Sequence, residues 1–499
     1  MSAFDIGAHL PVLQVVVPLV AAPVSVLVND ARRVWWLAFV VSSACLAISI
    51  GLLSQVSAGE SISYLLGGWA APWGIEYRVD ALNALVLVLV SGLSTVALVF
   101  ARESVEREIS AERVHLFYTA WLLCLTGLLG ISVTGDAFNV FVFLEISSLS
   151  TYSLVAFGRQ RQALSAAFRY LVMGTIGGTF ILIGIGLLYA MTGTLNMADL
   201  AVRLEPVRDS ASVRAAFAFI VVGAGLKMAM FPLHAWLPGA YANAPSAASV
   251  FIAATSTKVA VYVLLRFTFT IFGLSFSFDT LLLAKILMVF AVLGVVVGSI
   301  AAIVQQDLKR MLAWSSVAQI GYMLIGIACA NMDGLTATLV HMFNHALMKG
   351  ALFMAIGCVA YRIGYVRLDS VAGLAHRMPW TFGAFALAGL SLIGVPFTAG
   401  FVSKWYLLLG VVEHGWWPLA GLLVLTSLMA IVYIGRVLEV AWFHDAEPNT
   451  VAARATEAPL SMLIPLWTLV LANIWFGIQT TVPVDIARTA AATMLGLQP

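Results

Sequence analysis

Residues 225–258 read GLKMAMFPLHAWLPGAYANAPSAASVFIAATSTK and place two lysines, Lys227 and Lys258, in otherwise apolar sequence. A lysine at the centre of a membrane-spanning helix costs ~2.5–3.5 kcal/mol on insertion scales, so it usually serves a pathway, a counter-ion or a binding site. Pro232 lacks a backbone donor and clashes with the preceding turn, so we expect the helix to break there. Broken helices in a membrane are tolerated where they line a cavity or are buried in protein. This stretch therefore predicts the functional site around which the other helices are arranged.

The composition indicates the class of protein. Of 499 residues, 62% are hydrophobic and only 10% are charged, whereas soluble proteins carry about 25% charged residues. This excludes an ordinary soluble enzyme. The net charge of +2, without a basic cluster, gives no indication of a nucleic-acid partner. The four cysteines lie in apolar runs without metal-ligand spacing, so we expect small core residues rather than disulfides or ligands.

A membrane span needs ~20 mostly apolar residues, and on that rule the sequence predicts about fourteen transmembrane helices. The expected ranges are 10–28, 34–53, 80–101, 114–133, 137–157, 166–191, 214–236, 246–272, 281–304, 309–330, 334–361, 379–412, 417–443 and 458–477. We expect the seventh and twelfth helices to be broken, at Pro232 and Pro396. The segments 54–79 and 192–213 are expected to be loops. The predicted fold is an all-α polytopic membrane protein.

Loop charges predict the orientation of the chain. With Lys309 and Arg310 at the start of the tenth span included, thirteen lysines and arginines fall on one side of the predicted membrane and four on the other. The positive-inside rule places the richer side in the cytoplasm and both termini on the non-cytoplasmic side. No Lys or Arg precedes Arg32, so the first apolar segment is expected to be a retained span rather than a secretory signal.

The two predicted breaks suggest an internal repeat. A Gly-Leu pair stands seven residues before each proline, at Gly225 before Pro232 and at Gly389 before Pro396. The broken helices are five spans apart, and an odd offset reverses orientation, which is typical of inverted repeats. We therefore expect two inverted five-helix repeats between an N-terminal part and a last helix. The predicted parts are 1–113, 114–272, 281–443 and 444–499.

Glu145 lies near the middle of the fifth predicted span. A lysine nearby would hold such a buried carboxylate ionised, and Lys227 is the candidate partner. A purely structural ion pair between two helices is the alternative. The further charges within the spans weaken that alternative, because a static pair needs no others.

Lys258 stands ~12 residues from each end of its predicted span, which is ~18 Å of helix at 1.5 Å per residue. A lysine side chain cannot reach water over that distance, so snorkelling does not explain it. Lys404 lies only ~8 residues before the end of the twelfth span, so a snorkelling role remains the alternative there.

The eleventh span carries His341, Asn344, His345 and Lys349 in HMFNHALMKG. The spacing i, i+4, i+8 puts both imidazoles and the ammonium along one helix stripe. A zinc site of the metalloprotease kind needs a glutamate after the first histidine, and Met342 stands there instead. A neutral histidine can pass a proton through its two ring nitrogens. Histidines that are only satisfied core residues are the alternative.

These groups share a mid-membrane position and the ability to gain and lose a proton. We predict that they form a proton relay made of Glu145, Lys227, Lys258, His341, His345 and Lys404.

Several motifs resemble the antiporter-like subunits shared by respiratory complex I, membrane-bound hydrogenases and the multisubunit Mrp cation/proton antiporters. The motifs are GDAFNVFVFLEISSLSTY (135–152), FPLHAWLPGAYANAPSAAS (231–249), TKVAVYVLLRF (257–267), DLKRMLAWSSVAQIGY (307–322) and HMFNHALMKGALF (341–353). YAMTGTLNMADL (189–200) is most similar to the Mrp antiporter D subunit. The resemblance spans roughly residues 78–410.

The resemblance implies fourteen helices, two inverted five-helix repeats and proton translocation along a hydrophilic mid-membrane axis. It implies that the family's glutamate–lysine pair falls on Glu145 and Lys227 and its central lysine on Lys258. The family's histidines would fall on His341 and His345, and its last lysine on Lys404. Two departures concern Gly239, where relatives commonly have aspartate, and Phe397, where they often have a second proline. Lys404 also differs from the glutamate usual in the M subunit of complex I, but not from the L or N subunits.

Three functions follow as hypotheses. The first is a proton-translocating subunit of a multisubunit Na⁺/H⁺ antiporter, which is a secondary transporter rather than an enzyme. It would lie in the cell inner membrane and have other subunits as partners. The second is a pump module of complex I or a hydrogenase, driven by partner subunits. The third is a non-transporting scaffold. The sequence has no dinucleotide fingerprint, haem motif or cysteine cluster, so we expect no cofactor in this chain.

Overall fold

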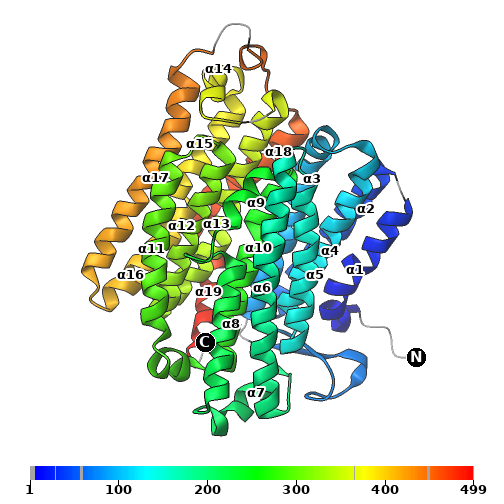
Figure 1. The fold of residues 1–499 in the computed structure, drawn as a ribbon, viewed down its shortest axis with the longest axis vertical. Coiled ribbons are helices and arrows are strands. Elements are labelled where there is room, and N and C mark those ends of the chain that lie inside the picture. The colour runs from blue at the N-terminus through cyan, green and yellow to red at the C-terminus, as the bar shows by residue number, and fades with distance from the viewer. Residues whose placement is uncertain (1–5, 29, 57–59, 365, 447–449, 498–499) are drawn as a thin grey trace.

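The computed structural model describes residues 6–28, 30–56, 60–364, 366–446 and 450–497, and most of them lie in helices (Figure 1). Within these ranges the helices are α1 (Leu10–Val28), α2 (Ala31–Val56), α3 (Ala81–Glu108), α4 (Val114–Val133), α5 (Ala137–Ala156), α6 (Arg161–Thr192), α7 (Met197–Leu204), α8 (Ala211–Met228), α9 (Leu237–Asn243), α10 (Ser246–Leu265), α11 (Leu283–Val304), α12 (Leu308–Cys329), α13 (Met332–Ile363), α14 (Leu374–Arg377), α15 (Pro379–Ile393), α16 (Ala399–Glu413), α17 (Trp417–Phe443), α18 (Leu460–Ile478) and α19 (Thr481–Met494). The structure confirms the mostly helical fold.

Thirteen helices of the described ranges are long and apolar enough to cross a membrane. Two shorter helices, α15 and α16, together cover the predicted twelfth span. Two predicted ends are wrong, because α3 extends to Glu108 rather than 101 and α6 begins at Arg161 rather than 166. The eighth span ends close to the predicted 272, because a π-helix, Arg266–Ile271, continues α10. Polar and charged residues such as those of 102–108 can continue a helix into water, where hydropathy no longer marks it.

The predicted seventh helix is broken. Its first part, α8, ends at Met228, and Ala229 takes a left-handed conformation with φ of 62°. The Trp236 indole N–H donates to the Leu226 carbonyl oxygen at 2.9 Å, which satisfies a carbonyl of the last turn. Pro232 lies in the connection between α8 and α9, and the break begins four residues before it.

The predicted twelfth helix is also broken, close to Pro396. α15 ends at Ile393, Gly394 has a φ of 93°, and α16 begins at Ala399. The carbonyl groups of the last turn of α15 are thereby left without helical partners and can accept hydrogen bonds from side chains. One of those side chains is Lys404, described below.

The two segments expected to be loops contain regular structure, so that expectation was wrong. Within 54–79, β1 (Ile62–Leu65) pairs with antiparallel β2 (Glu76–Val79). Within 192–213, α7 is capped by the Asn196 side chain, which accepts from two backbone N–H groups. A span search sees only long apolar runs, and these elements are short and amphipathic.

The last helix, α19, was not predicted. It has 14 residues, too few for a span, and its buried residues include Val484, Ala487, Ala491 and Met494. This three-to-four-residue spacing is typical of an amphipathic helix, and the buried side packs against α13 and α3.

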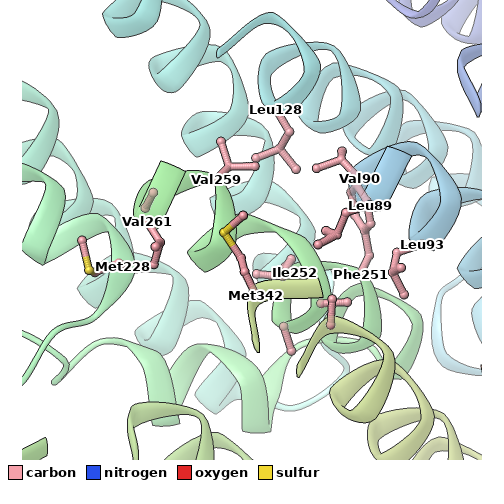
Figure 2. Packing of buried hydrophobic residues seen from close by; sticks show 14 of the residues in the cluster. Leu89, Val90, Leu93, Leu128, Met228, Phe251, Ile252, Val259, Val261 and Met342 are labelled. Atoms are coloured by element: carbon pink, nitrogen blue, oxygen red, sulfur yellow. The ribbon is translucent and has the colours of Figure 1, made fainter. Parts of the chain in front are cut away.

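α10 lies at the centre of the molecule (Figure 1). All of its residues except Ser256 are buried, and it packs against α3, α8 and α13. Figure 2 shows apolar side chains of these neighbours, such as Leu89, Met228 and Met342, gathered around it. Side chains on α10 are therefore held in a densely packed frame. All four cysteines are buried as well.

In Figure 1, α14 lies at the upper end of the molecule and α7 at the lower end. The segments around these two helices were predicted to lie on opposite sides of the membrane. The assignment of either end to the cytoplasm stays a prediction, as do the two inverted repeats and the four-part division. Residues 1–5 and 498–499, the termini whose side was predicted, lie outside the described ranges.

Candidate functional site

The Lys227 side chain on α8 meets the Glu145 side chain on α5. Lys227 Nζ lies 3.4 Å from Glu145 Oε1 and donates to Ser148 Oγ at 2.7 Å. The lysine side chain is 8% exposed and the glutamate side chain 23%. The predicted pairing is therefore present, with the ammonium buried and the carboxylate nearer the molecular surface.

Glycines of α6 make room for this pair. A Cβ at Gly178 would lie 2.1 Å from Glu145 Oε1 and 3.6 Å from Lys227 Nζ. A Cβ at Gly223 on α8 would lie 2.7 Å from the Gly177 carbonyl oxygen, so α6 and α8 are in backbone contact. The absence of side chains at these positions lets α5, α6 and α8 converge on the ion pair.

A small cavity leads from the pair toward α10. It has a volume of about 30 Å³, and its lining includes Lys227, Ser148, Thr151, Tyr170 and Ser256. A cavity of this size with several polar groups can hold a water molecule. The cavity thus connects the ammonium with Ser256, two residues before Lys258 on the same helix.

Lys258 is 1% exposed, deep within α10. Its ammonium donates to the Ala253 carbonyl oxygen at 2.5 Å, on its own helix. Across the described residues, no carboxylate lies within ion-pair distance of it. A buried lysine without a counter-ion is costly, which favours the functional interpretation over a static one.

The two histidines of α13 stack on each other, with ring centroids 5.7 Å apart. His341 Nε2 lies 2.9 Å from Gln319 Oε1, and its Nδ1 lies 2.8 Å from Ser403 Oγ. Because the amide oxygen only accepts, Nε2 donates to it, and the Ser403 hydroxyl lies between Nδ1 and the Gly400 carbonyl oxygen, which is 3.2 Å away. The His345 ring is fully buried, and neither of its nitrogens finds a hydrogen-bond partner within the described part of the chain.

Lys404 reaches back to the break in the twelfth helix. Its ammonium donates to the Leu392 and Ile393 carbonyl oxygens at 2.8 and 2.9 Å, and to Ser427 Oγ at 2.7 Å. It also lies 5.2 Å from the centre of the Tyr322 ring. The side chain is therefore turned into the protein beside the break, which disagrees with the snorkelling alternative.

The structure brings these groups into one series. Glu145 and Lys227 form a pair, the rings of His341 and His345 stack, and the Tyr322 ring lies near both the His341 ring and the Lys404 ammonium. Within the described residues, no direct hydrogen bond joins Lys258 to Lys227 or to either histidine. Any proton transfer at those two gaps must therefore go through intervening groups or water.

Sequence reasoning left out one side chain of this series. Lys349 is fully buried, and its ammonium donates to the Leu312 carbonyl oxygen at 2.7 Å and to Ser315 Oγ. Its position four residues after His345, on the same helix stripe, could have indicated its place beside the histidines.

Tyr322 was not singled out either. Its ring lies 6.2 Å from the His341 ring, and no spacing in the sequence indicates this contact.

The donor sets of these residues suit proton transfer better than metal binding. In the part of the chain that the structure describes, no three His, Cys, Asp or Glu residues stand close enough to hold a metal ion. Amines and imidazoles can accept and release protons without a bound group.

A bundle of membrane-length helices with two central breaks and a buried series of lysines and histidines defines a polytopic ion-transport protein. The chain belongs to the NADH:quinone oxidoreductase/Mrp antiporter transmembrane family, whose model matches residues 134–430.

Relatives include respiratory and antiporter proteins. The chain is 43% identical to the N subunit of the NADH-quinone oxidoreductase of Desulforudis audaxviator, over 94% of this chain and 96% of that protein. It is 28% identical to the D subunit of the Na⁺/H⁺ antiporter of Bacillus subtilis, over 97% of both chains. The solved Mrp complex of a Dietzia species contains a chain with a TM-score of 0.88 and 25% identity, covering 99% of this chain and 98% of that one.

Proposed function

We propose that the chain is the proton-translocating membrane subunit of a multisubunit monovalent cation (Na⁺)/H⁺ antiporter. Protons move along the buried residues Glu145, Lys227, Lys258, His341, His345 and Lys404. The observation that carries this proposal is the burial of Lys258 and Lys404 at mid-bundle without a carboxylate in ion-pair distance among the described residues. Such charges cost stability, so their presence calls for a function.

The geometry suggests how the first step works. The Glu145 charge stabilises the Lys227 ammonium across 3.4 Å. Because Glu145 is 23% exposed, its carboxylate has room to turn away, and the lysine would then release its proton more easily. The small cavity beside Lys227 leads that proton toward Ser256 and α10.

A second function is a proton-pumping subunit of a redox complex such as complex I or a membrane-bound hydrogenase. The 43% identity to the N subunit of an NADH-quinone oxidoreductase favours it. Both functions use the same relay, and they differ in the energy source. A non-transporting scaffold is the third candidate, and the uncompensated buried charges argue against it.

We also propose partners and a location. The relatives are named as subunits, so the partners would be other subunits of a membrane complex, with H⁺ and Na⁺ as the transported ions. The complex would lie in the cell inner membrane, and the side with more loop lysines and arginines would face the cytoplasm.

The experiment is to purify the complex through a tag on this chain from its native host and to identify the co-purifying subunits. Everted vesicles containing the complex are then given a pH gradient, and either Na⁺ or NADH is added. Na⁺-dependent collapse of the gradient supports the antiporter. Proton uptake driven only by an electron donor, with redox subunits in the preparation, would replace it with the second function.

A further inference from the structure

A second cavity, of about 450 Å³, lies where α3 ends and α12 begins, at the end of the molecule that carries α14 (Figure 1). Four cationic side chains line it: Arg107, Arg159, Lys309 and Arg362. They come from distant parts of the chain, namely the end of α3, the turn before α6, the start of α12 and the end of α13.

The two carboxylates that line the same cavity are already engaged. Glu108 Oε2 accepts from the Ser246 backbone N–H at 2.9 Å, which caps α10, and Oε1 accepts from Ser104 Oγ at 2.7 Å. Asp307 Oδ1 accepts from the Arg310 backbone N–H at 2.8 Å, which caps α12. Both acids therefore serve helix ends, and the cations outnumber them by two.

The contacts of the cations are largely neutral. The guanidinium carbons of Arg107 and Arg362 lie 4.8 and 5.4 Å from the centre of the same Tyr361 ring. Lys309 Nζ donates to the Ala244 carbonyl oxygen at 3.1 Å, and Arg362 donates to a backbone carbonyl. Within the described residues, none of the four cations lies within 4.0 Å of a carboxylate oxygen.

Membrane topology alone does not account for this arrangement. The positive-inside rule explains an excess of arginine and lysine in the loops of one face. It does not require four cations to converge on one cavity between helices, nor two guanidinium groups to lie against one ring. Glu108 and Asp307 offset two of the four charges, so the lining keeps an excess of two positive charges, which favours a bound anion.

We infer that this cavity binds a phosphate group, and that the occupant is the headgroup of an anionic phospholipid. Arginine presents paired N–H donors that match phosphate oxygens. Basic pockets between transmembrane helices, at the level of the helix ends, recognise anionic headgroups. A bound phosphate links α3, α12 and α13 at the turn where α10 begins, independently of the relay.

The test uses the delipidated full chain in detergent, followed by thermal unfolding. Phosphatidylglycerol is compared with phosphatidylcholine and with inorganic phosphate. The cavity variant is Arg107→Gln/Arg362→Gln, and the matched control is Arg32→Gln/Arg377→Gln, which removes two exposed arginines outside the cavity lining. Arg159→Gln, at an exposed turn position, provides a second cavity variant that should fold in any case.

Phosphatidylglycerol should raise the unfolding temperature of the wild type and the control by several degrees more than phosphatidylcholine does. The cavity variants should lose at least half of this difference and retain severalfold less phosphatidylglycerol after purification. If millimolar inorganic phosphate raises the unfolding temperature of the wild type but not of the cavity variants, the cavity binds phosphate. The occupant would then be a free anion rather than a lipid headgroup. Equal responses of cavity and control variants, or equal protection by both lipids, would overturn the inference.

Discussion

The Lys227 ammonium lies 3.4 Å from Glu145 Oε1, and this ion pair joins the broken seventh helix to the unbroken fifth. The lysine is buried, whereas the glutamate is nearly one-quarter exposed. The pair therefore stands at the outer end of the series of titratable groups, where a change at the molecular surface can reach the buried lysine.

Removing either member of this pair should abolish transport. We expect Lys227→Ala and Glu145→Ala each to lower Na⁺-driven proton exchange at least tenfold in everted vesicles, with nearly normal assembly. The reason is that the relay needs both groups, whereas packing does not. Lys285→Ala, which removes an exposed lysine of α11, is the control and should keep full exchange. Normal exchange in both pair variants, at equal amounts of complex, would mean that the pair is structural.

A methyl group placed against the carboxylate should act in the same way. In Gly178→Ala the new Cβ would lie 2.1 Å from Glu145 Oε1, and the flexible carboxylate would have to move away from Lys227. We expect folding to be preserved and exchange to fall at least fivefold. Gly186→Ala, on the same helix, places its Cβ where no atom lies within 4 Å apart from the nearby backbone of α6 and the two adjacent residues, so it should keep full exchange. Similar activities of the two variants would show that the carboxylate position is unimportant.

A second ion pair outside the relay allows a test of stability. Arg266 donates to both oxygens of Asp80, at 2.8 and 2.9 Å, and Asp80 also caps α3. Asp80→Asn keeps a side-chain oxygen for the cap but leaves the Arg266 charge unpaired, so we expect the free energy of unfolding to fall by ~3 kcal/mol. Asp199→Asn, in the more exposed pair with Arg203, should cost less than about 1 kcal/mol.

The Asp80 effect should depend on pH. Burial raises the pKa of Asp80, but the charge and hydrogen bonds of Arg266 outweigh it and hold the pKa below its usual 3.8. A carboxyl group whose pKa is lower in the folded than in the unfolded protein stabilises the folded state at any pH above its unfolded pKa. This stabilisation is lost as the pH falls through the pKa of the folded state. The difference between wild type and Asp80→Asn should therefore be complete at pH 7 and shrink below pH 3.8. A difference that grows in acid would contradict this assignment.

The sequence was sufficient for the features that depend on local chemistry. Long apolar runs predicted the spans, and Pro232 and Pro396 predicted the two breaks. Lysines within apolar sequence predicted the buried groups. Short amphipathic elements such as β1, β2, α7 and α19 were missed, because their stability comes from packing on distant helices rather than from a continuous apolar run.

The contacts that complete the site could not be predicted from the sequence. Ser148 and Ser427 hold two of the ammonium groups, and Gln319 and Ser403 hold His341. Serine and glutamine are common in membrane helices and carry no distinctive spacing. Only the packing of α5 and α8 on α6, of α13 on α12 and α16, and of α17 on α16 brings these side chains to the titratable groups.

In the proposed relay, proton transfer through the second broken helix depends on Lys404, where a proton would leave and return during turnover. Arginine keeps the positive charge but is effectively never deprotonated in proteins. A cavity of about 350 Å³ beside Lys404 leaves room for the longer guanidinium, so Lys404→Arg should fold and assemble.

The most direct measurement is the rate at which Na⁺ collapses a pH gradient in everted vesicles with equal amounts of wild-type, Lys404→Arg and Lys404→Ala complex. We predict that both variants lose at least nine-tenths of the rate, because neither can pass a proton at this position. A near-normal rate for Lys404→Arg, with loss only in Lys404→Ala, would show that the charge alone is needed, and would remove Lys404 from the relay.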